Sequence, residues 1–164
     1  MSVDRKSLVG LFFALLCTAS MAGPVTLEHD EFMPEDVYGL RTDKPDQMLF
    51  QISSYRLTIG SEARPGGLND ALAAGVWLFA EGRSLAEGSP VRQAQIEFLN
   101  PGSRPRPARL DPATQTLFLY YPLAYLETVL SLIDAPGPAY VQARFYGNGT
   151  IWADLHAGPI ELKR

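Results

Sequence analysis

Cysteine, lysine and histidine are scarce in this chain of 164 residues, and each shortage excludes a kind of chemistry. The one cysteine is Cys17, so the chain that follows it has no internal disulfide, no thiolate nucleophile and no thiolate metal ligand. Only His29 and His156 offer an imidazole for acid–base chemistry or metal binding. Lysine occurs at positions 6, 44 and 163, and the preference for arginine over lysine is consistent with a bacterial gene.

Recognisable catalytic and cofactor-binding motifs are also missing. No serine lies in a G-x-S-x-G elbow, and Gly66-Gly67 is not followed by the lysine of a phosphate-binding loop. His29 stands among acidic residues, but adjacent side chains on an extended chain point to opposite faces and do not converge on one ion. The sequence therefore predicts no catalytic residue, no metal site and no cofactor, and it favours a protein that is not an enzyme.

The charge balance argues against a nucleic-acid ligand. The chain carries 14 basic and 18 acidic residues, a net charge of −4. Binding to a phosphate backbone needs a basic patch that releases condensed counterions. We therefore expect no nucleic acid among its partners. Arg104, Arg106 and Arg109 form a basic loop stiffened by prolines, which either joins two strands in solvent or docks an acidic partner.

Long apolar runs are confined to the first 22 residues. A charged start is followed by an apolar run from Ser7 to Thr18, and the small residues Ser20 and Ala22 precede Gly23. This pattern is typical of a secretory signal peptide. The run is shorter than the roughly 20 residues that a membrane-spanning helix needs. We predict a signal peptide over 1–22, a single β-rich domain over 23–164, and a periplasmic or secreted protein without a membrane anchor after cleavage.

Alternating apolar and polar side chains predict several short strands after the signal peptide. The strand patterns run over 48–52, 55–59, 76–80, 91–99 and 116–121, and a hairpin covers 139–155. The Ser53-Ser54 pair indicates a bend or bulge within one long strand. Residues 116–121 are apolar on both faces, which indicates a central strand. Apolar residues at helical spacing behind Pro122 predict one amphipathic helix over 122–133.

These elements predict a mainly β fold. Short strands separated by turn-rich segments are typical of a two-layer β-sandwich of the immunoglobulin-like type, here of about seven strands with the amphipathic helix packed on it. An α+β layered fold is the alternative, because the helix is long enough to form a layer of its own.

The hairpin around Gly147-Asn148-Gly149 predicts its own register. A two-residue Asn-Gly turn would place Phe145 beside Trp152 and mix apolar with polar side chains. A three-residue loop instead pairs Tyr146 with Thr150, and Gly149 supplies the left-handed residue that this loop needs. One face then becomes wholly apolar. Because a slip of one residue would reverse both faces, this agreement favours the three-residue loop.

The opposite face of the hairpin is the predicted binding surface. Aromatic and arginine side chains together are typical of binding hot spots. The alternative is that the helix over 122–133 or a second sheet covers these rings. Asp154 and His156 share this face, but alternating polar residues do so in any strand, so no catalytic role follows. The predicted binding residues are Tyr140, Gln142, Arg144, Tyr146, Trp152, Asp154 and His156.

We expect an exported, non-enzymatic binding protein that acts on a protein partner or an envelope polymer through this face. Its size and acidic charge also suit an inhibitor or immunity-type protein, because charge complementarity would favour a basic envelope hydrolase as the partner. Two other functions stay open. One is a small secreted hydrolase that uses carboxylates, and the other is a structural accessory of an envelope assembly.

Overall fold

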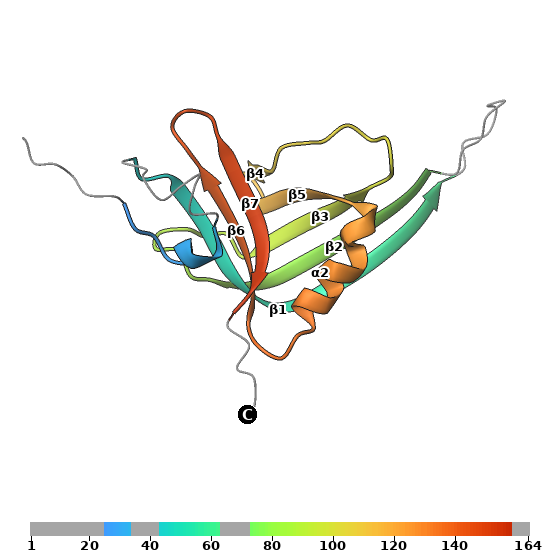
Figure 1. Cartoon of the computed structure of the whole chain (residues 1–164), viewed down its shortest axis with the longest axis horizontal. Helices are drawn as coiled ribbons and strands as arrows, with labels where there is room; N and C mark the ends of the chain where they lie inside the picture. The colour runs from blue at the N-terminus through green and yellow to red at the C-terminus, as the bar shows by residue number, and fades with distance from the viewer. Residues whose placement is uncertain (1–24, 34–42, 63–72, 159–164) are drawn as a thin grey trace, which may run out of the picture.

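The computed structural model describes residues 25–33, 43–62 and 73–158, so the predicted signal peptide lies outside the described part. The strands of this part form one mixed sheet in the order β4-β5-β3-β2-β1-β6-β7 (Figure 1). The elements are η1 (Asp30–Phe32), β1 (Asp46–Glu62), β2 (Ala73–Ser84), β3 (Gln93–Leu99), β4 (Arg109–Asp111), β5 (Thr116–Pro122), η2 (Leu123–Tyr125), α2 (Leu126–Ile133), β6 (Ala139–Phe145) and β7 (Ile151–Ala157). None of the helices in the described ranges combines the length and apolar character needed to cross a membrane.

The structure confirms a mainly β fold, but the two-layer sandwich was wrong. The seven strands belong to a single sheet that curls into a half-barrel, and α2 packs on its apolar face (Figure 1). The single sheet results from the pairing of β1, whose residues Asp46 to Gln51 pair with β6 while Phe50 to Glu62 pair with β2. The hairpin that could have belonged to a second layer is therefore joined edge to edge with the rest of the sheet.

The bend in β1 comes from a β-bulge at Ser53. The pairing between β1 and β2 shifts register between Ile52 and Ser54, so Ser53 is the extra residue. Its hydroxyl donates a hydrogen bond to the Glu81 carbonyl at 3.2 Å. The prediction of one long strand interrupted at Ser53-Ser54 is confirmed.

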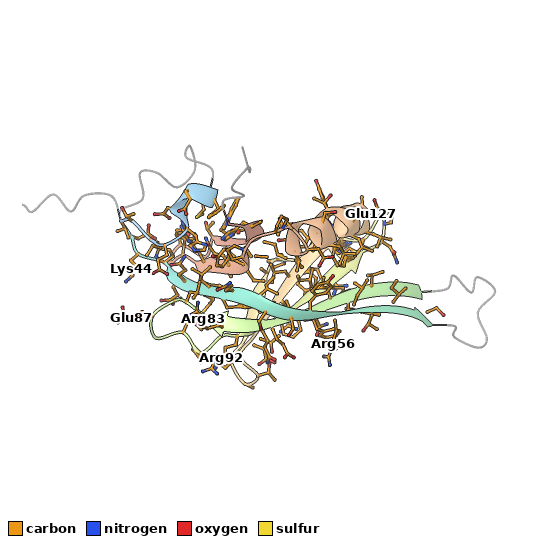
Figure 2. All side chains as sticks on the ribbon, turned by 90° about the horizontal axis from the view of Figure 1, so that it is seen from below. Lys44, Arg56, Arg83, Glu87, Arg92 and Glu127 are labelled. Atoms are coloured by element: carbon orange, nitrogen blue, oxygen red, sulfur yellow. The ribbon has the colours of Figure 1, made fainter. Side chains whose placement is uncertain are left out.

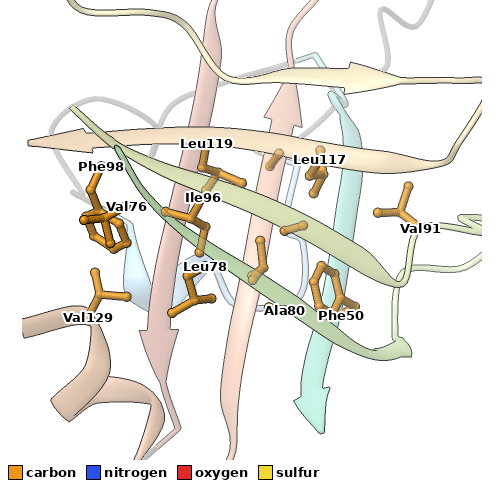
Figure 3. Close-up of a cluster of buried hydrophobic side chains, with 13 residues drawn as sticks. Phe50, Val76, Leu78, Ala80, Val91, Ile96, Phe98, Leu117, Leu119 and Val129 are labelled. Atoms are coloured by element: carbon orange, nitrogen blue, oxygen red, sulfur yellow. The ribbon is translucent and has the colours of Figure 1, made fainter. Parts of the chain in front are cut away.

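The core lies between the curled sheet and α2. Alternate residues of β2, β3 and β5 point into it, and Leu78, Ile96 and Leu119 are at most 1 % exposed. Figure 3 shows these side chains converging from neighbouring strands, with Val129 of α2 at the border of the cluster. The helix predicted over 122–133 is confirmed as η2 followed by α2. It takes the place that a second sheet would have filled.

The strand predicted at the centre of the sheet lies next to its edge. β5 pairs along its length with β3, in parallel, but its other neighbour β4 has only three residues. The prediction of a central strand was wrong because the two side chains that point away from the core, Phe118 and Tyr120, are aromatic. Arginine side chains cover both rings, with Arg109 over Phe118 and Arg106 over Tyr120. A strand with two apolar faces therefore does not need two protein layers around it.

The predicted hairpin register is confirmed in every pair. Phe145 lies opposite Ile151, and Tyr146 donates its N–H to the Thr150 carbonyl at 2.9 Å. Gly149 has φ 86°, the left-handed conformation that the three-residue loop requires. The apolar side chains of β6 point to the core, and the predicted binding residues lie on the other face.

Gly149→Ala is expected to lower the free energy of unfolding by about 1 kcal/mol, because an L side chain is strained at this φ. A Cβ at Gly149 would have no atom within 4 Å, so no clash contributes. Gly147→Ala is the matched control, since Gly147 has equal space and no left-handed φ. Urea denaturation of both variants checks this, and equal losses would contradict the role assigned to Gly149.

Candidate functional site

The seven predicted binding residues come together on one face of β6 and β7, but the face is closed. Gln142 and Arg144 are fully buried, while His156 and Tyr146 are 7 % and 8 % exposed. Tyr140, Trp152 and Asp154 are half-buried. Side chains with so little exposure contact a partner only if their cover moves.

The cover is the N-terminal segment of residues 25–33, which we call the strap. It consists of a short extended stretch and the helix η1, drawn in blue in Figure 1, and it contacts the hairpin at Arg144 and His156. Neither cover considered from the sequence is the actual one, because α2 packs on the opposite, apolar face of the sheet with Val129 in the core. In this position the carboxylate of Asp30 pairs with Arg144 of β6.

Arg144 holds the strap to the sheet. Its Nη1 lies 2.5 Å from the Asp30 carboxylate, and its Nη2 donates to the Glu28 carbonyl at 2.8 Å. The amide oxygen of Gln142, turned toward the guanidinium, accepts from Nε at 2.9 Å. Met33 packs its sulfur against Nη1. A buried guanidinium is tolerable only when its donors are satisfied in this way.

A chain of hydrogen bonds runs beside this anchor. Asp154 accepts from the Trp152 indole and lies 2.5 Å from Nδ1 of His156. The Nε2 atom of His156 lies 2.6 Å from Nδ1 of His29 on the strap. Phe32 of the strap stacks on the His156 ring with a centroid distance of 4.1 Å. When both imidazoles are neutral, His156 donates to Asp154 and accepts the proton of His29.

The two imidazoles disfavour a second positive charge. Burial, followed by the proximity of His156, lowers the pKa of His29 below its ordinary value of 6.5. Glu31, Glu28 and Asp154 act in the opposite direction but do not outweigh these two effects.

The chemistry of this cluster is structural in the closed state. Asp154 orients His156 as a catalytic carboxylate would, but the second ring nitrogen faces His29 instead of a nucleophile or a cavity. Within the described residues, His, Asp and Glu side chains form no group of three that could hold a metal ion.

A second candidate surface lies on the outer face of the sheet, the side turned away from the core. Five residues stand in register across five neighbouring strands and form one row. The row is Arg56, Phe79, Gln95, Phe118 and Arg109. With strands about 4.8 Å apart, it is about 19 Å long and carries a guanidinium at each end.

Stacking fixes the two terminal arginines of the row. The Arg109 guanidinium lies 3.7 Å from the centre of the Phe118 ring, and that of Arg56 lies 5.2 Å from the centre of Phe79. A guanidinium over a ring gains cation–π energy and keeps its N–H edge free to bind planar anions. Both arginines are exposed. Figure 2 shows Arg56 on the side of the sheet opposite Glu127 of α2.

Polar side chains, the carboxylates of Glu81 and Asp111 among them, flank the row on one side. A shallow groove of about 310 Å³ runs over Phe79, Gln95 and Phe118 and is bordered by Arg56 and Asp111. The groove is therefore aromatic at its floor and charged at its rim, which is the composition of many recognition surfaces.

The next row adds a further arginine–aromatic pair. Arg106 lies 5.1 Å from the centre of the Tyr120 ring and 2.9 Å from the Glu97 carboxylate. Trp77 lies beside Glu97 in the same row. The basic loop predicted from the sequence thus supplies part of the outer face, because Arg106 and Arg109 extend it at the edge of the sheet.

The other residues of the row were not identified from the sequence. Alternation placed Gln95 on the outside of its strand, but the row exists only through the order and register of five strands. The aromatic residues Phe118 and Tyr120 on the second face of their strand were the one local signal, and they were interpreted as buried.

Comparisons with protein-family models, with curated proteins and with solved structures found no match to this chain.

Proposed function

We propose that this chain is an exported, non-enzymatic binding protein, periplasmic or secreted, whose outer sheet face binds an acidic surface of a partner protein. The observation that carries the proposal is the row Arg56, Phe79, Gln95, Phe118 and Arg109, which stands in register across five strands. Arginine and aromatic residues concentrate binding energy in protein interfaces.

The charges of the row favour carboxylates as the groups that it recognises. Each terminal guanidinium lies over a phenylalanine ring, which limits its freedom while its N–H edge can still contact a carboxylate. Less side-chain entropy is then lost on binding. The same stacking covers the rings that a sugar would need, and this favours a protein over an envelope polymer as the partner.

A binding role also suits the rest of the molecule. The Asp154 and His156 pair is closed under the strap and faces no cavity that could take a substrate, so a hydrolase gains no support there. An inhibitor or immunity-type protein would use such a face to cover the acidic part of its target.

Site-specific photocrosslinking in cells tests this proposal. A benzophenone amino acid at Gln95, in the centre of the row, is expected to capture a protein with an acidic surface. The same group at Glu127, on the opposite side of the sheet (Figure 2), is the control and is expected to capture nothing in common with it. Equal capture from both positions would contradict the proposal, and capture of a glycan would assign the face to an envelope polymer.

The double variant Arg56→Ala plus Arg109→Ala is expected to weaken binding to the captured partner by at least about 100-fold, from the loss of two contacts of about 1.4 kcal/mol or more each. Lys44→Ala plus Arg83→Ala removes the same charge from outside the row and is expected to change affinity less than about threefold. Calorimetry with purified partner measures both. Similar losses in the two double variants would show a general charge effect and not a site.

A further inference from the structure

The strap shows what kind of ligand the hairpin face can hold. Asp30 occupies the Arg144 guanidinium, Phe32 stacks on His156, and Met33 packs against the same guanidinium. These are contacts of a peptide in a groove, made by a segment that is 111 to 127 residues away in sequence from the residues it touches. The strap therefore occupies the hairpin face as a bound peptide would.

The contact between the imidazoles of His29 and His156 makes the stability of the bound strap depend on pH. One proton between His29 Nδ1 and His156 Nε2 makes a hydrogen bond at 2.6 Å, whereas two protons would place two donors and two positive charges in opposition. The strap contributes Glu28 and Glu31 to the surroundings of His29, β6 contributes Tyr140, and β7 contributes Asp154 and His156. Asp30 of the strap pairs with Arg144 of β6.

We propose that the strap is a displaceable cover, which acid releases by placing a charge on His29 against the imidazole of His156, and that the uncovered hairpin face then binds a partner segment with the chemistry of Asp30, Phe32 and Met33. The partner segment would carry an acidic residue followed by an aromatic residue and methionine. This face is distinct from the outer sheet face, so the two proposals stand or fall separately.

The direction of the pH effect follows from the depressed pKa of His29 in the closed state. A base with a lowered pKa in the closed state stabilises that state fully above its ordinary value of 6.5. The stabilisation is lost as the pH falls below 6.5 and through the lowered pKa of the closed form. The Asp30 carboxylate, whose ordinary pKa lies near 3.9, stays charged over the upper part of this range.

A synthetic peptide of residues 25–33 with glutamine in place of His29 is the probe. The cover has an effective concentration in the millimolar range because it is tethered, so the probe should bind only weakly at about pH 7.5. At about pH 5 a charge on His29 of the cover is disfavoured beside His156, whereas the glutamine of the probe carries no charge. We expect binding to the full chain to tighten on the order of tenfold by fluorescence anisotropy.

Two controls keep the proposal falsifiable. In the chain variant His29→Gln the cover no longer responds to acid, so the probe is expected to be excluded at both pH values. A probe that also carries asparagine in place of Asp30 should fail at both, because it lacks the anchor for Arg144. Probe affinity that is equal at both pH values, or that rises in acid for the His29→Gln chain, would overturn the proposal.

Hydrogen exchange of the strap amides gives an independent measurement. After correction for the intrinsic rate, protection of Phe32 and Met33, whose N–H groups bond to His29 and Asp30, should fall on the order of tenfold between about pH 7.5 and pH 5. The His29→Gln chain should keep its protection. Unchanged protection in the wild-type chain would refute release of the strap, whatever the probe does.

Discussion

Gly82→Ala is expected to lower the free energy of unfolding by about 3 kcal/mol or more, because it forces backbone into backbone. A Cβ at Gly82 would lie 1.8 Å from the carbonyl oxygen of Gln51 and 2.7 Å from its carbonyl carbon. Both atoms belong to the neighbouring strand β1. No side-chain rotation can relieve such a contact, so the two strands must separate locally.

The separation would fall at the point that curls the sheet. Gly82 pairs with Ile52 immediately before the bulge at Ser53, and its N–H donates to the Arg92 carbonyl at 2.8 Å. The bulge bends β1 so that its residues Asp46 to Gln51 can pair with β6. Movement of β1 away from Gly82 would therefore loosen the join between the hairpin and the rest of the half-barrel, and with it the packing around Phe50 (Figure 3).

Gly75→Ala is the control, because it places an equally short contact against a side chain. A Cβ at Gly75 would lie 2.1 Å from the outer end of the Trp77 ring, which lies across Gly60 and Gly75 on the outer face. The ring can turn away, so a smaller loss of about 1 kcal/mol is expected. Urea denaturation measures both variants. A loss of stability in Gly75→Ala equal to or larger than that in Gly82→Ala would contradict the role assigned to Gly82 beside the bulge.

The elements of this fold were predictable where the information is local. The hairpin register followed from Gly149 and from the apolar pairing of Phe145 with Ile151 across a short loop. The bulge at Ser53 was visible because the alternation changes phase there. Each of these features depends on residues that are close in sequence, which is why one chain was enough to predict them.

The arrangement of the strands was not predictable in the same way. A strand with one apolar face needs one layer against it, and a second sheet or a curled sheet with a helix satisfies this equally. The choice depended on the pairing of β1 with β6, which joins segments about 90 residues apart. No local pattern encodes that pairing, so the sandwich prediction was wrong although every strand of the described residues except the three-residue β4 was predicted.

The burial of Arg144 shows the same limit at the candidate site. In the strand pattern Arg144 alternates with apolar residues and so indicates an exposed face. It is fully buried because Asp30, 114 residues earlier in the chain, is brought onto it. The acidic residues around His29 had no predicted partner. Only the three-dimensional structure shows that one of them, Asp30, pairs with Arg144 of the hairpin.

Arg144→Ala is expected to cost about 3 kcal/mol of unfolding free energy and to release the strap at neutral pH. The substitution leaves the Gln142 amide and the Glu28 carbonyl without their donor and leaves a cavity in place of a guanidinium. The Asp30 carboxylate is 27 % exposed, so it regains water when the strap lifts. Because Asp30 is hydrated again, the loss of unfolding free energy stays at the lower end of the range for a broken buried ion pair.

Two readouts and a matched variant separate this role from a general effect of losing an arginine. Urea denaturation gives the stability, and hydrogen exchange at Phe32 and Met33 reports the strap directly. Arg83→Ala removes an exposed arginine that donates a hydrogen bond of 3.3 Å to the side chain of Gln51. It is expected to change the free energy of unfolding by about 0.5 kcal/mol or less and to leave the strap amides fully protected from exchange. If Arg144→Ala were destabilised while the strap stayed protected, Arg144 would support the sheet and not the cover. A strap that lost protection in Arg144→Ala at neutral pH would place the anchor at Arg144 and leave the imidazole pair as the part that responds to acid.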